Sequence, residues 1–444
     1  MTSDSDVLIA GAGVAGLAAA QKLTAAGQRV TILEARDRIG GRVFTHPASR
    51  EFPIEMGAEF IHGKPPEIFD WIEQKHLPVN ELDGEFWYTE NGKLCTDEFP
   101  AERSRVFERM EKYRGPDISF RRFLDEFCND LPSEEKQWAA SYVAGFHAAN
   151  TELISLRSIV EGEKAEEEIE GERQFRFSQG YGSLIDIMRQ AIDPGLCQWR
   201  LNHVASEVRW RGGEVEIEGH SPAGEPLPRQ RAQKAIITLP LGVLQLPAGT
   251  QGAVLFSPPL EKKREALSQL AMGTAVHVTL VFREAFWHDA ALTRTPRGLR
   301  RMLFLFSDNP WFPTWWSKLP AGTRALTAWC AGPRAQQYCG QPTTFVEQNA
   351  AEALGQMLGV DSKRIASSLE AAYFHDWQAD PFCRGGYSYV MAGGNEKAQR
   401  ELAAPMENTL FFAGEATNSR GHHATVHGAI ASGYRAAAEV LAAN

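Results

Sequence analysis

The sequence predicts an α/β fold in which a Rossmann-like domain, of the kind that binds FAD or NAD(P), carries an inserted α+β domain. A short apolar strand at 6–10 leads into the glycine-rich turn GAGVAG at 11–16, and this turn opens an Ala-rich helix expected over 17–26. A second strand, expected over 28–33, ends at Glu34. Together these segments form a βαβ unit of the usual length, about 30 residues.

Each glycine of the turn has a physical role. Gly11 permits a tight turn, Gly13 leaves room for a pyrophosphate, and Gly16 lets the helix pack closely on the strand. The free N–H groups at the start of the helix then face the phosphates. Glu34 follows Gly16 by 18 residues and can accept hydrogen bonds from a ribose diol. This combination predicts a dinucleotide site.

Helical and extended patterns alternate along the rest of the chain. We expect a mostly helical stretch over 64–175, a hairpin over 203–218 that turns at Gly212-Gly213, and a final helix over 424–442. Buried strands are expected at 235–239, 274–282 and 410–413. Alternation along 274–282 predicts one face with Val276, Val278, Leu280 and Phe282 and another with His277, Thr279 and Val281.

Composition limits the classes of function. The chain has 444 residues, enough for two or three domains, and its net charge of -10 argues against a nucleic-acid partner. Six scattered cysteines without a CxxC pair indicate reduced thiols and a cytoplasmic protein. The polar, acidic start at 1–6 predicts no signal peptide, and the lack of a long apolar run predicts no membrane span. We interpret the acidic run at 161–172 as a solvated helix face rather than a trap for polyamines.

Several further motifs appear in a fixed order. They are EARDRIGGR at 34–42, EMGA at 55–58, TLPLGV at 238–243, GGYSY at 385–389 and FAGE at 412–415. Together they resemble the flavin amine oxidase family of monoamine oxidases, polyamine oxidases and lysine-specific histone demethylases. The segments WQADPFCRGGY at 377–387 and ATVHG at 424–428 are most similar to the polyamine oxidase and demethylase branch. The resemblance covers the whole chain.

The resemblance implies FAD as the cofactor and a discontinuous FAD-binding domain, with residues 1–65, 176–260 and 378–444. Residues 66–175 and 261–377 would form the substrate-binding domain. In monoamine oxidases a cysteine beside the Gly-Gly pair carries the flavin covalently; the matching residue here is Tyr387, which predicts non-covalent FAD. The residues expected to contact FAD are Gly11, Gly13, Gly16, Glu34, Ala35, Arg36, Gly41, Arg42, Gly57, Ala58, Val204, Trp377, Gly414, Glu415, Thr425 and Val426.

The implied chemistry is amine oxidation, with hydride transfer from the carbon next to the nitrogen to flavin N5 and reoxidation by oxygen that gives hydrogen peroxide. The expected catalytic residues are His277, Tyr387 and Trp377, of which the two aromatic residues would form walls that desolvate the amine. His277 stands where family members usually carry a lysine that holds a water near the flavin. An imidazole titrates near neutrality and cannot supply a fixed ammonium charge.

The substrate cavity is expected to include Glu59, His62, His422 and His423. Although His423 and His427 lie one helical turn apart, no third ligand is evident, so no metal site is expected. The stretch 286–316 is rich in aromatic residues, and some of these are expected near the cavity entrance, with core packing favoured for any one of them.

Two alternatives remain open. One is an L-amino-acid oxidase or another FAD oxidoreductase on the same fold, which would need a guanidinium such as Arg384 or Arg420 to hold a carboxylate. The other is an FAD-binding scaffold with little turnover that acts through a partner. The expected small-molecule partners are an amine and oxygen. The sequence leaves open which amine is the substrate, whether oxygen is the physiological acceptor, and whether the chain forms a homodimer.

Overall fold

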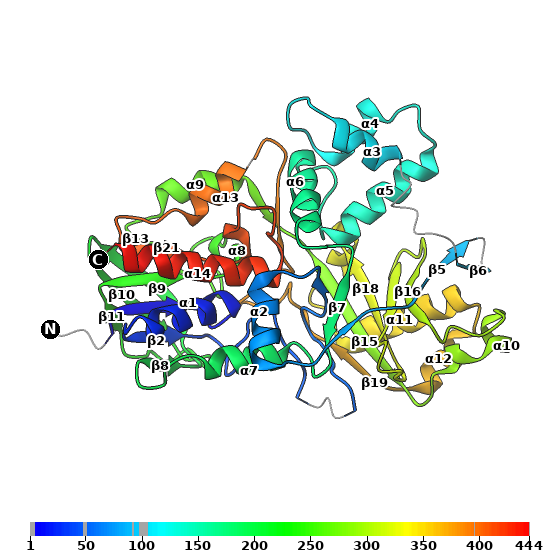
Figure 1. Ribbon diagram of the computed structural model, residues 1–444, viewed down its shortest axis with the longest axis horizontal. Helices are drawn as coiled ribbons and strands as arrows, with labels where there is room; N and C mark the ends of the chain where they lie inside the picture. Colours follow the sequence, from blue (N-terminus) through cyan, green and yellow to red (C-terminus); the bar gives the residue numbers. More distant parts are fainter. Residues whose placement is uncertain (1–4, 48–50, 91–92, 97–104, 395, 444) are drawn as a thin grey trace.

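The computed structural model describes residues 5–47, 51–90, 93–96, 105–394 and 396–443. Residues 1–4 of the acidic start, on which the expectation of no signal peptide rests, lie outside this range. Figure 1 shows a lobe that holds both termini, a second lobe built around a large sheet, and a helical lobe above the second. No helix in the described parts of the chain is long and apolar enough to cross a membrane.

The first lobe is built on a parallel sheet of five strands in the order β21-β12-β1-β2-β8. Their bounds are Leu410–Phe412 for β21, Lys234–Ile237 for β12, Val7–Ala10 for β1, Val30–Leu33 for β2 and Cys197–Arg200 for β8. The first four are buried along their whole length, as expected for a parallel sheet that is covered on both faces. The predicted α/β fold and its βαβ unit are confirmed.

Two helices at opposite ends of the chain pack together on this sheet. They are α1 (Val14–Ala25) and α14 (Val426–Ala442), and they share one apolar core with α2 (Pro66–Lys75) and α7 (Gly182–Gln190). Helix α1 begins inside the glycine turn, three residues earlier than predicted, with Gly13 as its N-cap. Helix α14 begins two residues later than predicted, because Ala424 has a φ of 64° and Thr425 is the N-cap.

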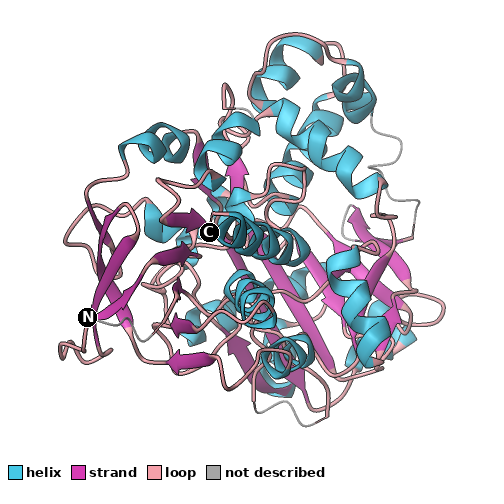
Figure 2. Ribbon diagram, turned by 60° about the vertical axis from the view of Figure 1, so that its left-hand side comes forward, coloured by secondary structure: helices cyan, strands magenta, loops and turns pink. Residues whose placement is uncertain are grey.

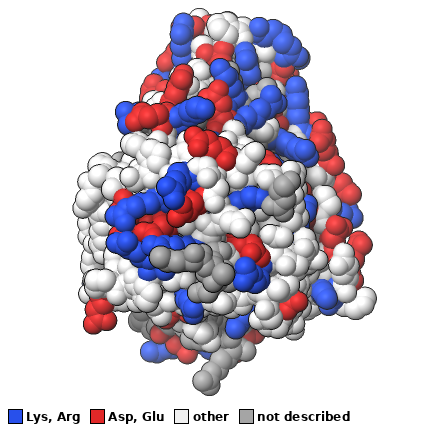
Figure 3. All heavy atoms as spheres, turned by 90° about the vertical axis from the view of Figure 1, so that its left-hand side faces the viewer, with Lys and Arg blue, Asp and Glu red and all other residues white. Residues whose placement is uncertain are grey.

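A four-stranded sheet, β11-β10-β9-β13, covers the other side of the parallel sheet through a second apolar cluster. The predicted hairpin is confirmed as β9 (Val204–Arg211) and β10 (Glu214–His220), joined at 212–213; β11 spans Gln230–Ala232 and β13 spans Leu255–Ser257. Arginine and glutamate side chains alternate on these strands, as in the ion pair of Arg209 with Glu207. Figure 3 shows basic and acidic side chains interleaved on this end of the molecule.

The second lobe contains a sheet of seven strands in the order β19-β15-β18-β17-β16-β5-β6. Their bounds are Leu369–Phe374, Ala275–Phe282, Ala325–Ala331, Thr314–Ser317, Met302–Phe306, Glu85–Glu90 and Lys93–Cys95, in that order. The alternation predicted for β15 is confirmed, since Val276, Val278, Leu280 and Phe282 all join the core beneath α11 (Thr343–Leu358). His277 and Thr279 lie on the opposite face.

The expectation of a mostly helical stretch over 64–175 is correct for the helical lobe, which Figure 2 shows as free of strands, and wrong for residues 79–95. The lobe contains α3 (Arg105–Lys112), α4 (Phe120–Phe127), α5 (Ser133–Phe146) and α6 (Leu156–Glu167). Strand β5 pairs with β16, more than 200 residues away, and β4 (Val79–Glu81) pairs with β7 (Gln174–Phe177), which also pairs with β3 (Ile61–His62). These strands exist because of distant partners that local patterning does not reveal.

The remaining elements connect the lobes. A two-stranded ladder joins β14 (Leu270–Met272) to β20 (Ser388–Val390), next to α8 (Leu241–Leu244) and α9 (Glu261–Ser268). Helices α10 (Ala290–Thr293), α12 (Ser362–Ser368) and α13 (Glu396–Ala403) complete the described helices, with short 3-10 turns at Phe286–His288, Pro333–Tyr338 and Glu415–Thr417. All six cysteines are free of disulfides.

Candidate functional site

A cavity of about 1450 Å³ runs from the glycine turn of the first lobe to the aromatic face of the second lobe. Pockets for drug-sized ligands usually measure about 300–1,000 Å³, so this cavity has room for a dinucleotide and a second molecule. Of the residues predicted to bind cofactor or substrate or to act in catalysis, all except Gly16 line it. Segments separated by up to four hundred residues in the sequence therefore meet at one site.

The glycine turn has the geometry that a dinucleotide needs. A Cβ built on Gly13 would meet nothing nearer than the Cα of Gly41 at 4.0 Å, so the space in front of it stays open toward the cavity. A Cβ on Gly16 would lie 2.1 Å from the carbonyl oxygen of Gly11, so Gly16 is needed for close packing inside the turn and does not line the cavity. The Gly40-Gly41 pair packs on the glycine turn, since the Gly40 N–H donates to Ala12 O at 2.8 Å.

Glu34 lies at the end of β2, buried at the edge of the cavity. Its two carboxylate oxygens accept the N–H groups of Ala12 at 2.8 Å and Arg36 at 3.0 Å, which fixes the side chain beside the turn. A carboxylate can accept about four hydrogen bonds, so two positions remain for a ribose diol. Val204 lies nearby at the start of β9 and lines the same end of the cavity. These residues fit an adenosine moiety.

Arg42 and Glu415 form a buried link between the two ends of the chain. Arg42 Nη1 donates to Glu415 Oε1 at 2.9 Å and to the Gly386 carbonyl at 2.8 Å. Glu415 Oε2 accepts from Ser388 Oγ at 2.5 Å and from the Ala424 N–H at 3.0 Å. Although burial alone would raise the pKa of Glu415, Arg42 and these hydrogen bonds lower it, so the carboxylate is ionised and held in place.

The N-terminus of α14 opens onto the cavity at Thr425 and Val426. Thr425 Oγ1 accepts the Gly428 N–H at 3.0 Å, which caps the helix. The first N–H groups of a helix lack intrahelical partners and carry the positive end of the helix dipole. This helix start suits an electron-rich ring edge such as that of a reduced flavin.

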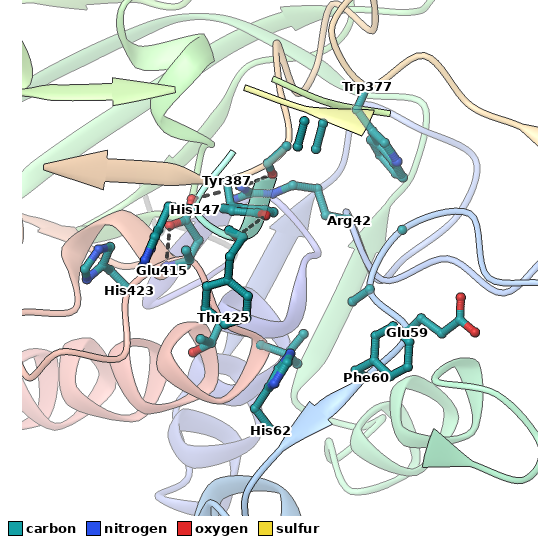
Figure 4. A pocket seen from close by; sticks show the side chains of 18 of the residues that line it. Arg42, Glu59, Phe60, His62, His147, Trp377, Tyr387, Glu415, His423 and Thr425 are labelled. Atoms are coloured by element: carbon teal, nitrogen blue, oxygen red, sulfur yellow. Dashed lines mark hydrogen bonds and ion pairs between the residues drawn. The ribbon is translucent and has the colours of Figure 1, made fainter. Parts of the chain in front are cut away.

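Trp377 and Tyr387 form aromatic walls of the cavity, as Figure 4 shows. Trp377 Nε1 donates to Met56 O at 2.6 Å, and the Tyr387 hydroxyl donates to Phe146 O at 2.7 Å. Burial raises the pKa of Tyr387, so its hydroxyl stays protonated. Both rings are therefore fixed by hydrogen bonds at their polar ends and present their apolar faces to a ligand.

His277 lies on the cavity face of β15, beside the rings of Trp316 and Trp329, which also contact each other. Its Nε2 lies 2.8 Å from the backbone carbonyl of Glu55. Burial lowers the pKa of the imidazole, and this effect outweighs the opposite influence of Glu59. The ring is therefore neutral near pH 7, unlike the lysine that family members usually carry at this position.

Glu59 borders the cavity, as predicted, and is also a buried counter-ion. Its Oε1 accepts from Lys318 Nζ at 2.8 Å and lies 3.0 Å from Arg176 Nη2, and its Oε2 accepts from Trp316 Nε1 at 3.1 Å. Burial alone would raise its pKa, but Lys318 and Arg176 lower it to about 2. Figure 4 shows the carboxylate directed away from His62 and Tyr387.

The other predicted substrate residues line the cavity as neutral imidazoles. Burial lowers the pKa of His62 to about 4 and also lowers the pKa values of His422 and His423. Within the described residues, no three His, Cys, Asp or Glu side chains are grouped in a way that could hold a metal ion. These histidines can therefore offer one donor and one acceptor each, without charge.

Sequence reasoning missed the contribution of the helical lobe to the cavity. Tyr142 and Phe146 on α5 line it, as do Phe304 and Phe306 on β16. Among the aromatic residues of 286–316, Trp316 also reaches it. The residues that pack in the core are Phe286, Trp287, Phe312 and Trp315, with Trp311 partly buried against them. The one usable signal was the spacing of α5, which places Trp138, Tyr142 and Phe146 on one helix face.

The interpretation of the acidic run as a purely solvated face is also wrong. Glu163 and Glu166 on α6 are partly buried and line the cavity together with Glu108 and Glu111 of α3. Burial and the neighbouring carboxylates raise the pKa of Glu163 to about 8, and burial raises the pKa of Glu166 to about 7. The helical lobe therefore gives this part of the cavity an acidic wall.

Comparison with known proteins identifies the family of this chain. The sequence profile of the family described as flavin containing amine oxidoreductase matches residues 14–441. Polyamine oxidase 2 of Arabidopsis thaliana is 28% identical, over 98% of this chain and 88% of its own length. Lysine-specific histone demethylase 1 homolog 2 of Oryza sativa subsp. japonica is 28% identical over 99% of this chain and 57% of its own length. This chain covers between 30% and 59% of the length of five demethylase homologues from plants and mammals.

The fold is also that of a solved enzyme structure. Wild-type putrescine oxidase bound to putrescine superposes with a TM-score of 0.79 and 20% identity, over 99% of both chains. The family profile spans nearly the whole chain, and the motifs of the glycine turn, of the segment after Trp377 and of the start of α14 all meet at one cavity. The chain belongs to the flavin-containing amine oxidoreductase family.

Proposed function

We propose that this protein is an FAD-dependent amine oxidase. The observation that carries the proposal is the single cavity that joins the dinucleotide cradle at Gly13 and Glu34 to the aromatic walls at Trp377 and Tyr387. Bound FAD would supply the hydride acceptor, its N5 atom. The overall reaction is RCH₂–NHR′ + O₂ + H₂O → RCHO + R′NH₂ + H₂O₂, in which the amine carbon is oxidised and oxygen is reduced.

FAD would be held without a covalent bond. The family position that carries the flavin in monoamine oxidases is Tyr387 in this chain. Cys383 also borders the cavity, but its Sγ donates to Gly385 O at 3.0 Å and burial raises the pKa of the thiol to about 11. A protonated thiol is a poor nucleophile, so Cys383 is unsuited to attack a flavin.

The residues around the substrate would exclude water from the amine and orient its N–H groups. The walls of Trp377 and Tyr387 exclude water, and a low-polarity cavity favours the neutral form of an amine, which has the lone pair that assists C–H cleavage. Neutral imidazoles at His62 and His423 can orient N–H groups without adding positive charge. The aromatic walls and the neutral histidines together favour an amine as the group that is oxidised.

The acidic wall favours a substrate with a second cationic group. Glu111, Glu163 and Glu166 face the cavity from α3 and α6, and a cationic head bound beside them would lower the raised pKa values of Glu163 and Glu166 and favour their ionised forms. Neither Arg384 nor Arg420 lines the cavity, which weakens the alternative of an amino-acid oxidase, although Arg334 does reach it. Diamines and polyamines are therefore the proposed substrate class. The similarity to polyamine oxidase 2 in sequence and to putrescine oxidase in fold supports this choice.

Anaerobic mixing tests this proposal. The purified yellow protein would be mixed with a panel of monoamines, diamines, polyamines and L-amino acids while the visible absorption of the flavin is followed. We expect bleaching by diamines or polyamines, then recovery of the colour and formation of hydrogen peroxide when oxygen is admitted. Bleaching by amino acids alone would favour the amino-acid oxidase, and no bleaching by any compound would favour the scaffold.

A further inference from the structure

We propose that His277 is a catalytic base whose Nδ1 atom accepts the proton that the substrate ammonium must lose before hydride transfer. This inference rests on the proposed function and deepens it. It concerns the position where family members usually carry a lysine, which can donate hydrogen bonds but cannot accept a proton while it is charged. The substitution would therefore place a proton acceptor where family members usually have a hydrogen-bond donor.

The tautomer of His277 follows from a single contact. A backbone carbonyl can only accept a hydrogen bond, so the 2.8 Å contact between His277 Nε2 and Glu55 O requires the proton to be on Nε2. In the neutral ring Nδ1 then carries the lone pair. Nδ1 makes no hydrogen bond with the described residues and is not sealed off from solvent, and the ring lines the cavity. The lone pair therefore meets the space where a substrate would lie.

The position of the ring is fixed from several sides. Strand β15 directs its odd-numbered side chains, including His277, away from the apolar core beneath α11. The rings of Trp316 and Trp329 lie 6.3 Å and 6.4 Å from the imidazole, measured between centroids. The hydrogen bond between Nε2 and the Glu55 carbonyl sets the orientation of the ring among these neighbours.

Three ionisable groups from other elements act on the charge of His277. Burial lowers its pKa, Glu59 raises it, and Lys318 and His375 lower it. At neutral pH the free imidazole is therefore ready to accept a proton. After uptake, the imidazolium would be stabilised by the carboxylate of Glu59, which remains ionised because its own pKa is about 2.

The proton step is balanced. An N–H bond of the substrate ammonium breaks, an Nδ1–H bond forms, and the positive charge moves from the amine to the imidazole. No oxidant or reductant is required. The amine keeps the electron pair of the broken bond as its lone pair, which can then assist the loss of hydride from the neighbouring carbon.

The first test reads the tautomer directly. The purified protein, labelled with ¹⁵N at its histidines, would be measured by long-range ¹H–¹⁵N correlation NMR above pH 7, with His277→Gln used to assign the signals. We expect the Nε2–H pattern for His277. An Nδ1–H pattern would overturn the proposal, and this result does not depend on any enzymatic activity.

The second test uses kinetics with the best diamine or polyamine from the panel. At pH 7 the His277→Gln variant should lose about 100-fold in kcat/KM, the range of general base catalysis. The loss should shrink by about tenfold per pH unit above pH 7 and vanish near about pH 9, because the fraction of free neutral amine, with a pKa near that of lysine at about 10.4, rises tenfold per unit over this range. An unchanged kcat/KM and pH profile in this variant would overturn the inference alone.

Controls separate this inference from folding and from the proposed function. His288→Gln removes a histidine that does not line the cavity and should leave kcat/KM unchanged. Each variant should retain the flavin absorbance of the wild type, and His277→Asn would replace His277→Gln if that variant lost FAD. A wild type that no amine reduces would contradict the proposed function itself, whereas an active wild type with an unaffected His277→Gln would contradict only the role of His277.

Discussion

Glu55 and Glu59 are separated by four residues and have opposite electrostatic environments. Burial raises the pKa of Glu55 to about 7, although Tyr181 N–H and Thr45 Oγ1 donate to it at 2.7 Å and 2.8 Å. Glu59 is equally buried, but Lys318 and Arg176 lower its pKa to about 2. The difference lies in the partners, since a full positive charge offsets desolvation and neutral donors do so only in part.

Breaking this buried pair should be costly. We expect Lys318→Met to lower the free energy of unfolding by about 3–5 kcal/mol, because Glu59 would keep its charge without its closest cation. The measurement is chemical denaturation of the FAD-loaded protein at pH 7. The double variant Glu59→Gln/Lys318→Met is the matched control and should recover much of the loss. Equal losses in the single and double variants would show that packing, not charge, determines the effect.

The lowered pKa of Glu59 makes the free energy of unfolding fall as the pH becomes acidic. The pKa of Glu59 is about 2 in the folded protein and near the ordinary 4.5 in the unfolded chain. Its ionised form therefore stabilises the fold above about pH 4.5, and this contribution is lost as the pH falls toward 2. The stability difference between wild type and Glu59→Gln should shrink across this interval. A constant difference from pH 6 to pH 3 would contradict the assigned pKa.

At the scale of elements, the contact between α1 and α14 joins the first helix of the chain to the last. Gly433 makes this contact possible, because a Cβ there would lie 2.2 Å from the carbonyl oxygen of Ala15 and 3.0 Å from the Cβ of Ala18. The two helices carry the N-termini that face opposite ends of the cavity, at Gly13 and at Thr425. Their packing therefore sets the spacing of the cofactor site.

We expect Gly433→Ala to lower the free energy of unfolding by about 1–3 kcal/mol through overpacking, and to weaken FAD retention. Gly145→Ala is the matched control for stability, since Gly145 lies within α5 at the border of the cavity and a Cβ there meets nothing within 4 Å. The control should be neutral or stabilise by up to about 1 kcal/mol, because alanine is the better helix former. Thermal denaturation and the ratio of flavin to protein absorbance measure both effects. Equal behaviour of the two variants would contradict the packing argument.

Prediction at the scale of elements succeeded where the signal is local. The βαβ unit, the hairpin at 212–213 and strand β15 all have clear periodicity, and the structure confirms them. Strand β5 was missed because its partner β16 lies more than 200 residues along the chain, and β6 is placed in the sheet through its pairing with β5. Pairing of this kind depends on tertiary contacts, which override weak local preference.

At the scale of the whole molecule, the cavity has walls from every lobe. The glycine turn belongs to the first lobe, His277 to the large sheet, and Tyr142 to the helical lobe. A ligand that fills such a cavity binds only the assembled arrangement, so its binding free energy adds to the stability of the fold.

Removal of FAD should therefore destabilise the entire protein. We expect protein stripped of flavin to unfold at a lower temperature, and added FAD at 100 times its Kd to restore about 2.7 kcal/mol. Differential scanning calorimetry with and without FAD gives the measurement, and NAD at the same concentration is the control ligand. A transition temperature that does not respond to FAD would contradict a cofactor site between the lobes.

The sequence by itself determined the α/β fold, the dinucleotide turn and the family, because these depend on short motifs whose physics is local: glycines that allow close approach, a helix start that faces phosphate, and an acid at the end of a strand. Only the tertiary structure decided the chemistry of the buried side chains. In the folded protein Glu59 lies beside Lys318 and Arg176, and His277 Nε2 lies within hydrogen-bond distance of the Glu55 carbonyl. Part of the acidic run lines the cavity. Burial and charge pairing depend on which distant residues meet, and no local pattern in the chain encodes that.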